Sequence, residues 1–565
     1  MKKLLSIILC LSLLLSYGVL AVSAQEEKLI ATVASDLHLD QDSFAETLPK
    51  RNNVSEAYSH VASSGHLYSE SNAILTAFFQ QVAEDDSEVL LVPGDLGDTG
   101  LEIEHEALAE MFRKLEKETG KQVYVVPGNH DVTKNPVSKF AEIFAEFGYN
   151  EAIAKDTNSA SYVADLPDDY RLLAIDSTGY KQGGACIDAT RLEWIRQQAE
   201  QAQKDGKKAI AMLHHNVLPH LVMIEVFHST ALVNKNLNMK DMLAQYGVKY
   251  VFTGHSHEND IASYTAENGE VIYDVETGSM CLYPCTYRKV TFGENVKFEE
   301  KRVKAINTKL VPSGMSDEAF NLMSTNFTEY ARICAQMGVE KRVNEVLVSS
   351  AFIKNLLKIT ADKNPEMNAL FDKIVPRLND AVNMPFYAEE ETEEGKSIES
   401  VLAGYDVTIP DAEYDNLLNL AVAIYQIHVA GDENLTSYSN EVVLVSKGIG
   451  AALAYTLSDV TVEEYAMVLT FVCELLGVDV PADLINFAGD HIKRFEGIEL
   501  VISTAILPLI LKFTIDEAPG DLNVTLPGYA ELIEGPEPEK TFFEKVKDFF
   551  NKIITIILSA FAFMR

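Results

Sequence analysis

Residues 29–38 have the sequence LIATVASDLH, in which an apolar run from Leu29 to Ala34 is followed by Asp36 and His38. The run is short and rich in Leu, Ile, Val and Ala, which predicts a buried β-strand. A carboxylate and an imidazole two residues apart at the end of such a strand have a rigid support and can reach the same cation. This stretch therefore predicts a strand that carries metal ligands.

The same arrangement recurs along the first half of the chain. Further apolar runs occupy Val89–Val92, Gln122–Val126, Ala209–Leu213 and Tyr250–Phe252. The polar strings after them are Gly94-Asp95-Leu96-Gly97-Asp98, Gly128-Asn129-His130-Asp131, His214-His215 and Gly254-His255-Ser256-His257. Helical patterns alternate with the runs, as over Asn72–Glu84 and Glu104–Glu118. Strand, polar loop and helix in alternation predict an α/β fold whose ligands gather at one edge of the strands.

The donor set is made of carboxylate, amide and imidazole groups. Without thiolate, it suits Mn, Fe, Zn, Co or Ni, and it is too nitrogen-rich for calcium or for a site of magnesium alone. Asp95, flanked by glycine, is the candidate to bridge two ions. Two ions about 3.5–4 Å apart would activate water and clamp a phosphoryl group during in-line displacement.

These residues and their order resemble the calcineurin-like metallophosphoesterase superfamily over roughly Lys28 to Val303. The resemblance implies a metallophosphoesterase-type αββα sandwich that holds two divalent or trivalent metal ions, with Mn, Fe and Zn as the foremost candidates. It assigns one ion to Asp36, His38, Asp95 and His257, and the other to Asp95, Asn129, His214 and His255.

The resemblance also implies two catalytic residues that are not ligands. His130 would contact a phosphoryl oxygen or protonate the leaving group, and Asp98 would orient His130. His214 is favoured over its neighbour His215 as a ligand because it directly follows the apolar run, and His215 stays an alternative. Each string alone is weak evidence, since a lone histidine is more often structural and Gly94 or Gly128 could be turn residues with positive φ.

Three further features allow a functional and an ordinary interpretation. His220 resembles a histidine that faces the substrate or supports the metal ligands from behind, and it could equally be an ordinary loop residue. The polar insert Asp40–Glu70, with His60 and His66, could overhang the metals or form a solvated surface loop. Arg288 could steady a phosphate or be an exposed structural arginine.

Charge and cysteine content exclude some function classes. The chain of 565 residues has 47 basic and 84 acidic side chains, a formal net charge of −37. Such a surface repels long polyanions, so we expect no long nucleic acid as partner and a small phosphate ester as substrate. The five cysteines outside the first 24 residues predict no disulfide framework.

The pattern divides the chain into four parts. Residues 1–24 are predicted to be a secretory signal peptide, with Lys2 and Lys3 before an apolar stretch and a small-x-small site at Ala24. Residues 28–305 form the predicted metallophosphoesterase domain, and residues 315–535 a mainly α-helical domain of unknown role. Residues 540–565 form an amphipathic, apolar tail that suits either peripheral contact with an anionic membrane or a helix docked on its own domain.

The leading hypothesis is a secreted dinuclear-metal phosphoesterase that is released from the cell or retained at its surface. It would hydrolyse small phosphate esters, diesters or nucleotides in preference to monoesters, by attack of a hydroxide held between the ions. The alternative is a surface-associated interaction protein in which the phosphoesterase part is an idle scaffold. We also expect the helical domain to pack beside the metal-bearing loops and narrow access to them.

Overall fold

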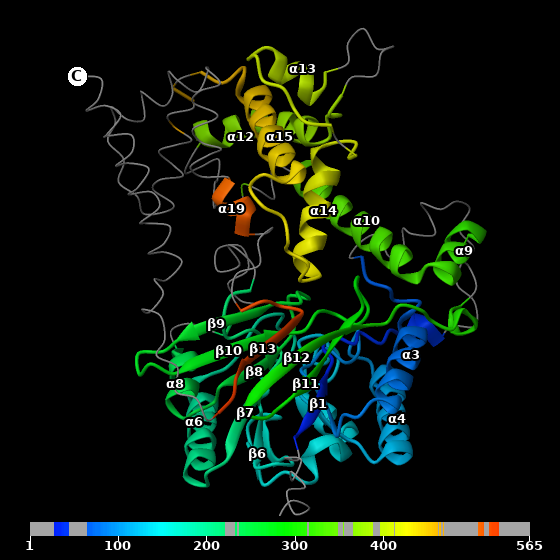
Figure 1. Cartoon of the computed structure of the whole chain (residues 1–565), viewed down its shortest axis with the longest axis vertical. Coiled ribbons are helices and arrows are strands. Elements are labelled where there is room, and N and C mark those ends of the chain that lie inside the picture. The colour runs from blue at the N-terminus through cyan, green and yellow to red at the C-terminus, as the bar shows by residue number, and fades with distance from the viewer. Residues whose placement is uncertain are drawn as a thin grey trace, which may run out of the picture.

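The computed structural model describes residues 28–44, 65–220, 232–233, 237–312, 316–348, 354, 365–387, 396–411, 413–461, 463–464, 467, 507–512 and 519–529. The predicted signal peptide (1–24) and tail (540–565) lie outside these residues, as does His60. Two lobes are visible in Figure 1, a lower one built around β-sheets and an upper one made of helices. We call them the sandwich lobe and the helical lobe.

The sandwich lobe contains two mixed sheets. The first has the order β13-β12-β11-β1-β2-β3 and the second the order β4-β5-β6-β7-β8-β10-β9. The strands of the first are β1 (Ile30–Val33), β2 (Val89–Val92), β3 (Gln122–Val125), β11 (Thr286–Thr291), β12 (Asn295–Arg302) and β13 (Asn523–Pro527). Those of the second are β4 (Ala154–Lys155), β5 (Tyr162–Asp165), β6 (Tyr170–Ala174), β7 (Lys208–Met212), β8 (Tyr250–Thr253), β9 (Ile261–Thr265) and β10 (Val271–Glu276).

Parallel pairing aligns the strand ends that matter for the site. β1, β2 and β3 run parallel to one another, and so do β6, β7, β8 and β10. All five apolar runs predicted as strands lie in these parallel groups, as β1, β2, β3, β7 and β8. Within each group the carboxyl ends therefore lie at the same edge of the sheet, where open α/β sheets bind their ligands.

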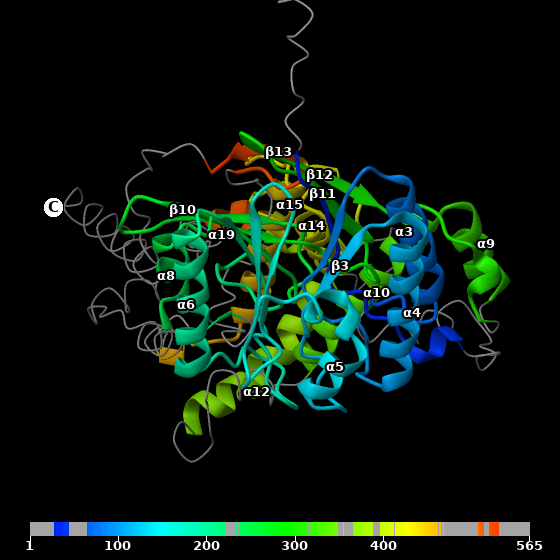
Figure 2. The same cartoon turned by 90° about the horizontal axis from the view of Figure 1, so that it is seen from below.

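Alternating side chains create the layers. In β7, Ile210 and Met212 belong to the large core between the sheets, whereas Ala209 and Ala211 belong to a second core against α6 and α8. This is the two-residue period of a strand whose two faces are both covered. The covering helices are α6 (Ala189–Lys204), α8 (Met239–Gln245), α3 (Ser71–Glu84) and α4 (Glu102–Thr119). Figure 2 shows α6 and α8 on one side of the sheets and α3 and α4 on the other, which confirms the αββα sandwich.

The helical lobe follows β12 in the chain. Its helices are α9 (Asp317–Thr325), α10 (Phe327–Val348), α12 (Pro365–Val382), α13 (Ile398–Ala403), α14 (Leu417–Val429), α15 (Asn440–Leu457) and α19 (Leu507–Lys512). Apolar side chains of α13, α14 and α15, such as Leu402, Leu420 and Val445, build a core of their own. In the described part of the chain, every helix is too short or too polar to cross a membrane.

One strand within the predicted helical range belongs to the sandwich. β13 pairs antiparallel with β12, with Val524 opposite Phe298. The hydroxyl of Tyr250 in β8 donates to the Pro527 carbonyl at 2.7 Å. The expectation that residues 315–535 are helical therefore needs correction at residues 523–527, where the chain returns to the edge of the first sheet.

The two lobes are packed together. Met323, Phe327 and Tyr330, from α9 and α10, belong to the large core of the sandwich lobe. At the end of α14, the Val429 carbonyl accepts a hydrogen bond from the Asn259 backbone at 3.1 Å, two residues after His257. The helical lobe thus lies beside the loops that carry the predicted ligands, as expected from the sequence.

Candidate metal centre

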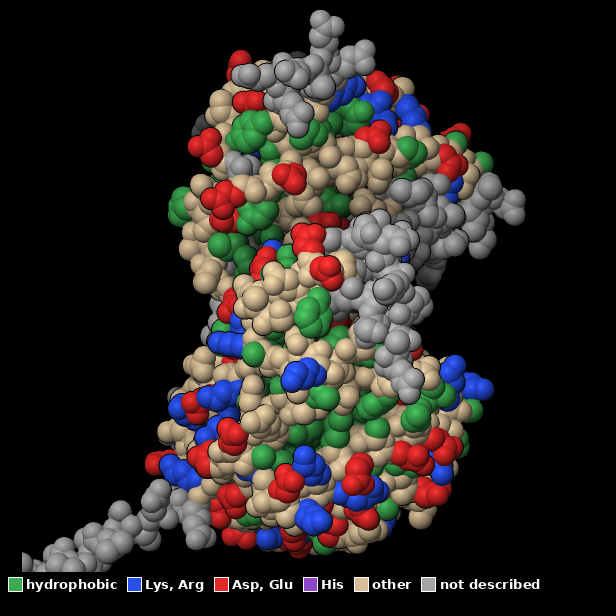
Figure 3. All heavy atoms as spheres, turned by 90° about the vertical axis from the view of Figure 1, so that its right-hand side faces the viewer, with side chains coloured by type: hydrophobic (Ala, Val, Ile, Leu, Met, Phe, Trp, Pro, Cys, Tyr) green, Lys and Arg blue, Asp and Glu red, His purple; other side chains and the backbone are tan. Residues whose placement is uncertain are grey.

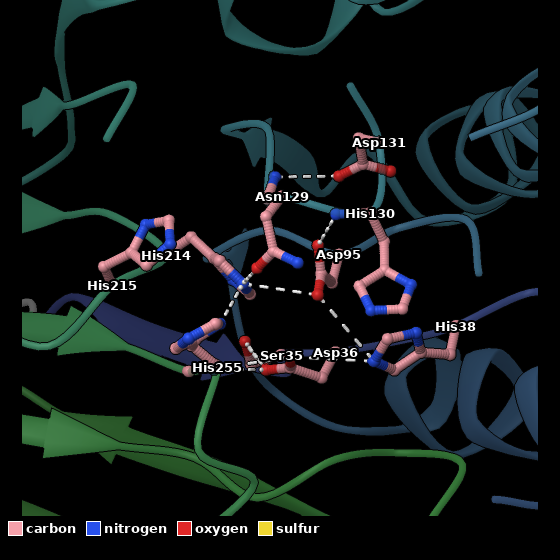
Figure 4. A network of polar contacts seen from close by, with 12 residues as sticks. Ser35, Asp36, His38, Asp95, Asn129, His130, Asp131, His214, His215 and His255 are labelled. Carbon is pink, nitrogen blue, oxygen red and sulfur yellow. Dashed lines mark hydrogen bonds and ion pairs between the residues drawn. The ribbon is translucent and has the colours of Figure 1, made fainter. Parts of the chain in front are cut away.

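The seven predicted ligands converge at the carboxyl ends of five parallel strands. They follow β1, β2, β3, β7 and β8, and Figure 4 shows the side chains of six of them, all but His257, pointing toward one another. They are Asp36, His38, Asp95, Asn129, His214, His255 and His257. Asp36, His38 and His214 are fully buried, and Asp95 is 1% exposed. Residues spread over more than 200 positions of sequence are therefore assembled by the parallel topology.

One half of the cluster surrounds Asp36. Its Oδ1 lies 3.2 Å from His257 Nε2 and 3.7 Å from His38 Nε2. The two imidazole Nε2 atoms, of His38 and His257, are 3.2 Å apart. Three donor atoms of the types that bind transition metals therefore face one small volume.

The other half surrounds His214. Its Nε2 lies 3.0 Å from Asn129 Oδ1, 3.2 Å from His255 Nδ1 and 3.3 Å from Asp95 Oδ2. The same Asp95 Oδ2 is 3.9 Å from His38 Nε2 in the first half. Asp95 thus occupies the position between the two halves that a bridging carboxylate requires.

The backbone at these residues is unusual. Asp36, His38, Asp95, His255 and His257 all have positive φ, between 42° and 77°. Residues other than glycine rarely adopt this conformation, and such strain clusters at functional sites. Hydrogen bonds between the two loops hold it, because the Asp36 and His38 amides donate to the Gly94 and Asp95 carbonyls at 3.1 and 3.0 Å.

Two motif glycines allow chain segments to approach closely. A Cβ atom at Gly128 would overlap the carboxylate of Asp95, and one at Gly254 would overlap the side chains of Ser35 and Asp36. The interpretation of Gly128 as a turn residue with positive φ is wrong, whereas Gly94 does have a φ of +98°. The absence of a side chain at these positions is what lets the ligand loops pack side by side.

Asp131 and Ser35 support the centre, and the sequence analysis gave neither a role. The Asp131 carboxylate accepts hydrogen bonds from the amides of Leu96, Gly97 and Gly128 at 2.8–3.1 Å. The Ser35 hydroxyl donates to Asp36 Oδ2 at 2.6 Å. The sequence contains one signal for the role of Asp131, namely its place at the end of the Gly128-Asn129-His130-Asp131 string. An Asp side chain near glycine in a turn commonly accepts hydrogen bonds from backbone amides and so fixes the loop.

His130 is the most accessible imidazole of the centre. Its amide donates to Asp95 Oδ1 at 2.8 Å, and its side chain is 39% exposed. Its Nδ1 lies 2.5 Å from the Asp98 carbonyl, an arrangement in which the ring donates from Nδ1 and leaves Nε2 for other partners. The Asp98 carboxylate is closer to His38 Nδ1, at 3.1 Å, than to His130 Nδ1, at 3.7 Å. Asp98 therefore contacts a predicted ligand as well as His130.

The adjacent histidines face different partners. His214 Nδ1 donates to the Pro93 carbonyl at 3.0 Å, which directs Nε2 toward Asp95. His215 Nδ1 instead pairs with the Ser177 hydroxyl at 2.8 Å, and burial holds the pKa of His215 well below its usual value. The geometry favours His214 as the ligand.

Buried opposite charges dominate the electrostatics. Burial by itself would lower the pKa of His38, but the hydrogen bond to Asp98 and the charge of Asp95 raise it to about 9. Burial likewise opposes protonation of His214, and Asp95 raises its pKa to about 9. Burial would raise the pKa of Asp36, yet the attraction of His257 holds it below the usual range. The carboxylates therefore demand nearby positive charge, which bound cations would supply in place of protons.

The donor set fits metal ions. In the described residues, three groups bring possible ligand atoms within 4.8 Å of one another. They are Asp36 with Asp95 and His214, His38 with Asp95 and His130, and His38 with His66 and His257. The first group contains the proposed bridging carboxylate. The third includes His66 from the insert Asp40–Glu70. From the sequence, this insert could be a solvated surface loop or could cover the metals.

Two other residues with open roles are buried. His220 is 7% exposed, and its Nδ1 pairs with Asp260 Oδ2 at 2.5 Å. Arg288 is completely buried, and its guanidinium donates to the carbonyls of Glu276 and Asp521. The expectation of an exposed arginine at 288 is wrong, because this side chain joins β10 to the segment before β13.

Comparisons with known proteins agree with this geometry. Residues 31–259 match the family model described as calcineurin-like phosphoesterase. A stretch of 173 residues is 25% identical to a "Probable glycerophosphodiester phosphodiesterase GpdQ" of Arcobacter nitrofigilis and covers 30% of this chain. That alignment spans 56% of the relative, so the chain matches little more than half of its length.

Solved structures are also similar to the chain. A dimetal phosphatase from Danio rerio aligns with a TM-score of 0.35 and 11% identity, over 48% of this chain and 96% of its own. The NAD nucleotidase of Haemophilus influenzae aligns with a TM-score of 0.29 and 10% identity, over 67% of this chain and 68% of its own.

Fold and site together define an αββα protein with a buried, nitrogen-rich centre suited to two metal ions. Residues 31–259, which lie in the sandwich lobe, match the model of the calcineurin-like phosphoesterase family.

Proposed function

We propose that the protein is a metal-dependent phosphoric ester hydrolase. The observation that carries this proposal is the convergence of seven candidate nitrogen and oxygen ligands, among which Asp95 lies between the two halves of the cluster. The family match over residues 31–259 supports the same reaction class. Asp36, His38, Asp95 and His257 would hold one ion, and Asp95, Asn129, His214 and His255 the other.

The two ions, when bound, would activate water and neutralise charge on the phosphoryl oxygens. The chain itself supplies the remaining functions. His130, with its Nδ1 held by the Asp98 carbonyl, can direct Nε2 to a phosphoryl oxygen or give a proton to the leaving oxygen. Asp98 holds His38 and His130 in place, and Asp131 fixes the loops that present Asp95 and Asn129.

We propose a small phosphate ester as substrate, with diesters or nucleotides preferred over monoesters. The similarity to a protein named as a glycerophosphodiester phosphodiesterase supports the preference for diesters. The net charge of −37 disfavours a long nucleic acid. On the face shown in Figure 3, Lys and Arg side chains of the sandwich lobe are interspersed with Asp and Glu rather than gathered into a basic patch.

Secretion and membrane contact are part of the proposal and rest on sequence alone. The apolar stretch before Ala24 supports export. The net basic tail, residues 540–565, supports contact with an anionic surface. Recovery of the processed protein outside the cell, with its new N-terminus at Gln25, would test export.

Replacing the bridging carboxylate tests the reaction. Asp95→Asn keeps the volume but removes the charge between the two halves, and we expect turnover of p-nitrophenyl phosphate and its bis ester to fall to background. The matched control is Asp169→Asn, because Asp169 is an exposed carboxylate that pairs with Lys207 at the surface. Turnover in Asp95→Asn equal to that of the control would contradict the mechanism.

The second candidate function is an interaction protein that uses the sandwich lobe as a scaffold. The extensive helical lobe, in which the described residues form no candidate metal group, favours keeping this alternative. Metal content separates the two. A chain grown with Mn and Zn that retains less than one ion and hydrolyses neither ester would support the interaction protein.

A further inference from the structure

A third histidine packs against two of the predicted ligands. The ring centroid of His66 lies 5.0 Å from that of His38 and 4.9 Å from that of His257. The rings meet edge to face, at interplanar angles of 69° and 84°. One nitrogen from each of the three side chains falls within 4.8 Å of the others, and His66 is only 8% exposed. The side chain therefore belongs to the centre rather than to the solvent.

The segment that carries His66 is fixed on both sides. The Leu67 amide donates to the Cys281 carbonyl at 2.8 Å, next to the loop that follows β10. Gly65, with a φ of +80°, lies so close to Ala335 of α10 that a Cβ atom would be 3.0 Å from its Cα. The Tyr330 hydroxyl of α10 donates to Glu70 at 2.6 Å. The helical lobe thus holds this end of the insert against the centre.

The chemistry of the cluster favours a cation. Metal ions bind imidazole nitrogen at about 2.0–2.1 Å, which places two nitrogens on the same ion about 3–3.5 Å apart. The 3.2 Å between the Nε2 atoms of His38 and His257 has this value. A ligand nitrogen of His66 lies within 4.8 Å of those of His38 and His257, and Asp36 Oδ1 lies 3.2 Å from His257 Nε2, so the four side chains gather around one small volume.

We propose that His66 is an additional nitrogen ligand of the ion held by Asp36, His38 and His257. This inference rests on the proposed metal centre and adds a residue to it. It makes the two ions unequal, because one is surrounded by three imidazoles and the other by two. A nitrogen-rich site discriminates more strongly in favour of Zn, Co or Ni over Mn. The helical lobe, through Gly65 and Glu70, would then take part in metal binding.

Metal affinity measures the contribution of His66. Wild type and His66→Ala are stripped with a chelator and titrated with Co²⁺ and Zn²⁺ against a chromophoric chelator, and bound ions are counted by mass spectrometry. We expect one of the two ions to bind at least about tenfold more weakly in His66→Ala. The other ion should keep its affinity, and the visible spectrum of the Co²⁺ protein should change.

The matched control is Tyr68→Phe. Tyr68 stacks on His66 with a centroid distance of 5.4 Å, so this variant alters the same segment and keeps the imidazole. Its two affinities and its Co²⁺ spectrum should equal those of wild type. Identical affinities and spectra in His66→Ala and wild type would overturn the proposal. If, in addition, KM for the ester rises in His66→Ala, His66 contacts the substrate rather than the metal.

A second measurement uses the wild-type protein and therefore tests the proposal even if His66→Ala does not fold. Crystals of the wild-type protein soaked with Zn²⁺ locate the ions by anomalous scattering. A nitrogen of His66 within about 2.3 Å of an ion supports the proposal, and a shortest distance above about 3 Å contradicts it. Failure of the proposed function gives a different result, because the wild-type chain would then bind no pair of ions and hydrolyse neither ester.

Discussion

The sandwich lobe and the helical lobe differ in how they use their sequence. In the sandwich lobe, the candidate ligands lie at strand ends, where each short apolar run is followed within three residues by Asp, Asn or His. In the helical lobe, the polar residues mostly cap helices or join neighbouring elements, as Asn416 does at the start of α14. The lobe nevertheless contacts the segments beside His66 and His257. A region without ligands can therefore shape a metal centre by holding the loops that carry them.

Removing the helical lobe should have the largest effect, because it tests whether the sandwich lobe is stable alone. A chain that ends at residue 312 loses Met323, Phe327 and Tyr330 from the core of the sandwich lobe, and it loses β13 from the sheet edge. Burial of three such side chains is worth on the order of 5 kcal/mol, so we expect a poorly soluble protein with a much lower melting temperature. Thermal unfolding followed by circular dichroism measures this. A soluble fragment as stable as the whole chain would show that the lobes are independent.

A buried histidine at the junction should make stability depend on pH. His428, at the end of α14, pairs with Glu433 at 2.6 Å and lies 4.0 Å from Glu258. Burial opposes its protonation, but the hydrogen bond to Glu433 and the charge of Glu258 raise the pKa of His428 to about 9. Because the folded pKa lies above the unfolded value of about 6.5, this stabilisation is complete below pH 6.5 and is lost as pH rises through 9.

The variant His428→Gln isolates that contribution. We expect wild type to be more stable than the variant at pH 6, and the difference in the free energy of unfolding should shrink steadily toward pH 10. Urea titrations at several pH values give the difference directly. A gap that stays constant from pH 6 to pH 10 would show that His428 is not protonated in the folded protein.

The smallest effect is expected from one hydroxyl at the junction. Tyr330→Phe removes the hydrogen bond to Glu70 and leaves the ring in the core, which should cost about 1–3 kcal/mol because Glu70 is fully buried. Tyr287→Phe is the matched control, since the Tyr287 hydroxyl donates to Gln81 at 2.9 Å in a part-buried position. Equal losses of stability in the two variants would show that the Glu70 contact has no special weight.

The sequence predicted the parts of the fold in which local pattern and tertiary position coincide. Runs such as Val89–Val92 are buried on both faces, so they are uniformly apolar and easy to recognise. β12 was not predicted, because in Asn295–Arg302 only Val296 and Phe298 are buried among charged side chains. β13 has only a short pattern, and its partner strand lies far back in the chain.

In the candidate site, too, some residues could be predicted from local sequence, and others depend on distant packing. Asp95 and His214 could be predicted because each lies within three residues of the end of its strand. The position of His66 could not, since it depends on the packing of Gly65 against Ala335, some 270 residues further along. Asp131 was quoted within its motif without a role, because its partners are backbone amides of two different loops.

The pairing of β12 with β13 has a topological consequence. The two strands are antiparallel neighbours at the rim of one sheet, yet residues 303–522 separate them in the chain. The helical lobe is thus inserted between two strands that would otherwise form a hairpin. The chain enters the lobe from β12 and leaves it into β13, and both strands belong to the same sheet. The lobe is therefore attached at both of its ends rather than at one. A rigid-body movement of the lobe would act on two adjacent strands of the same sheet.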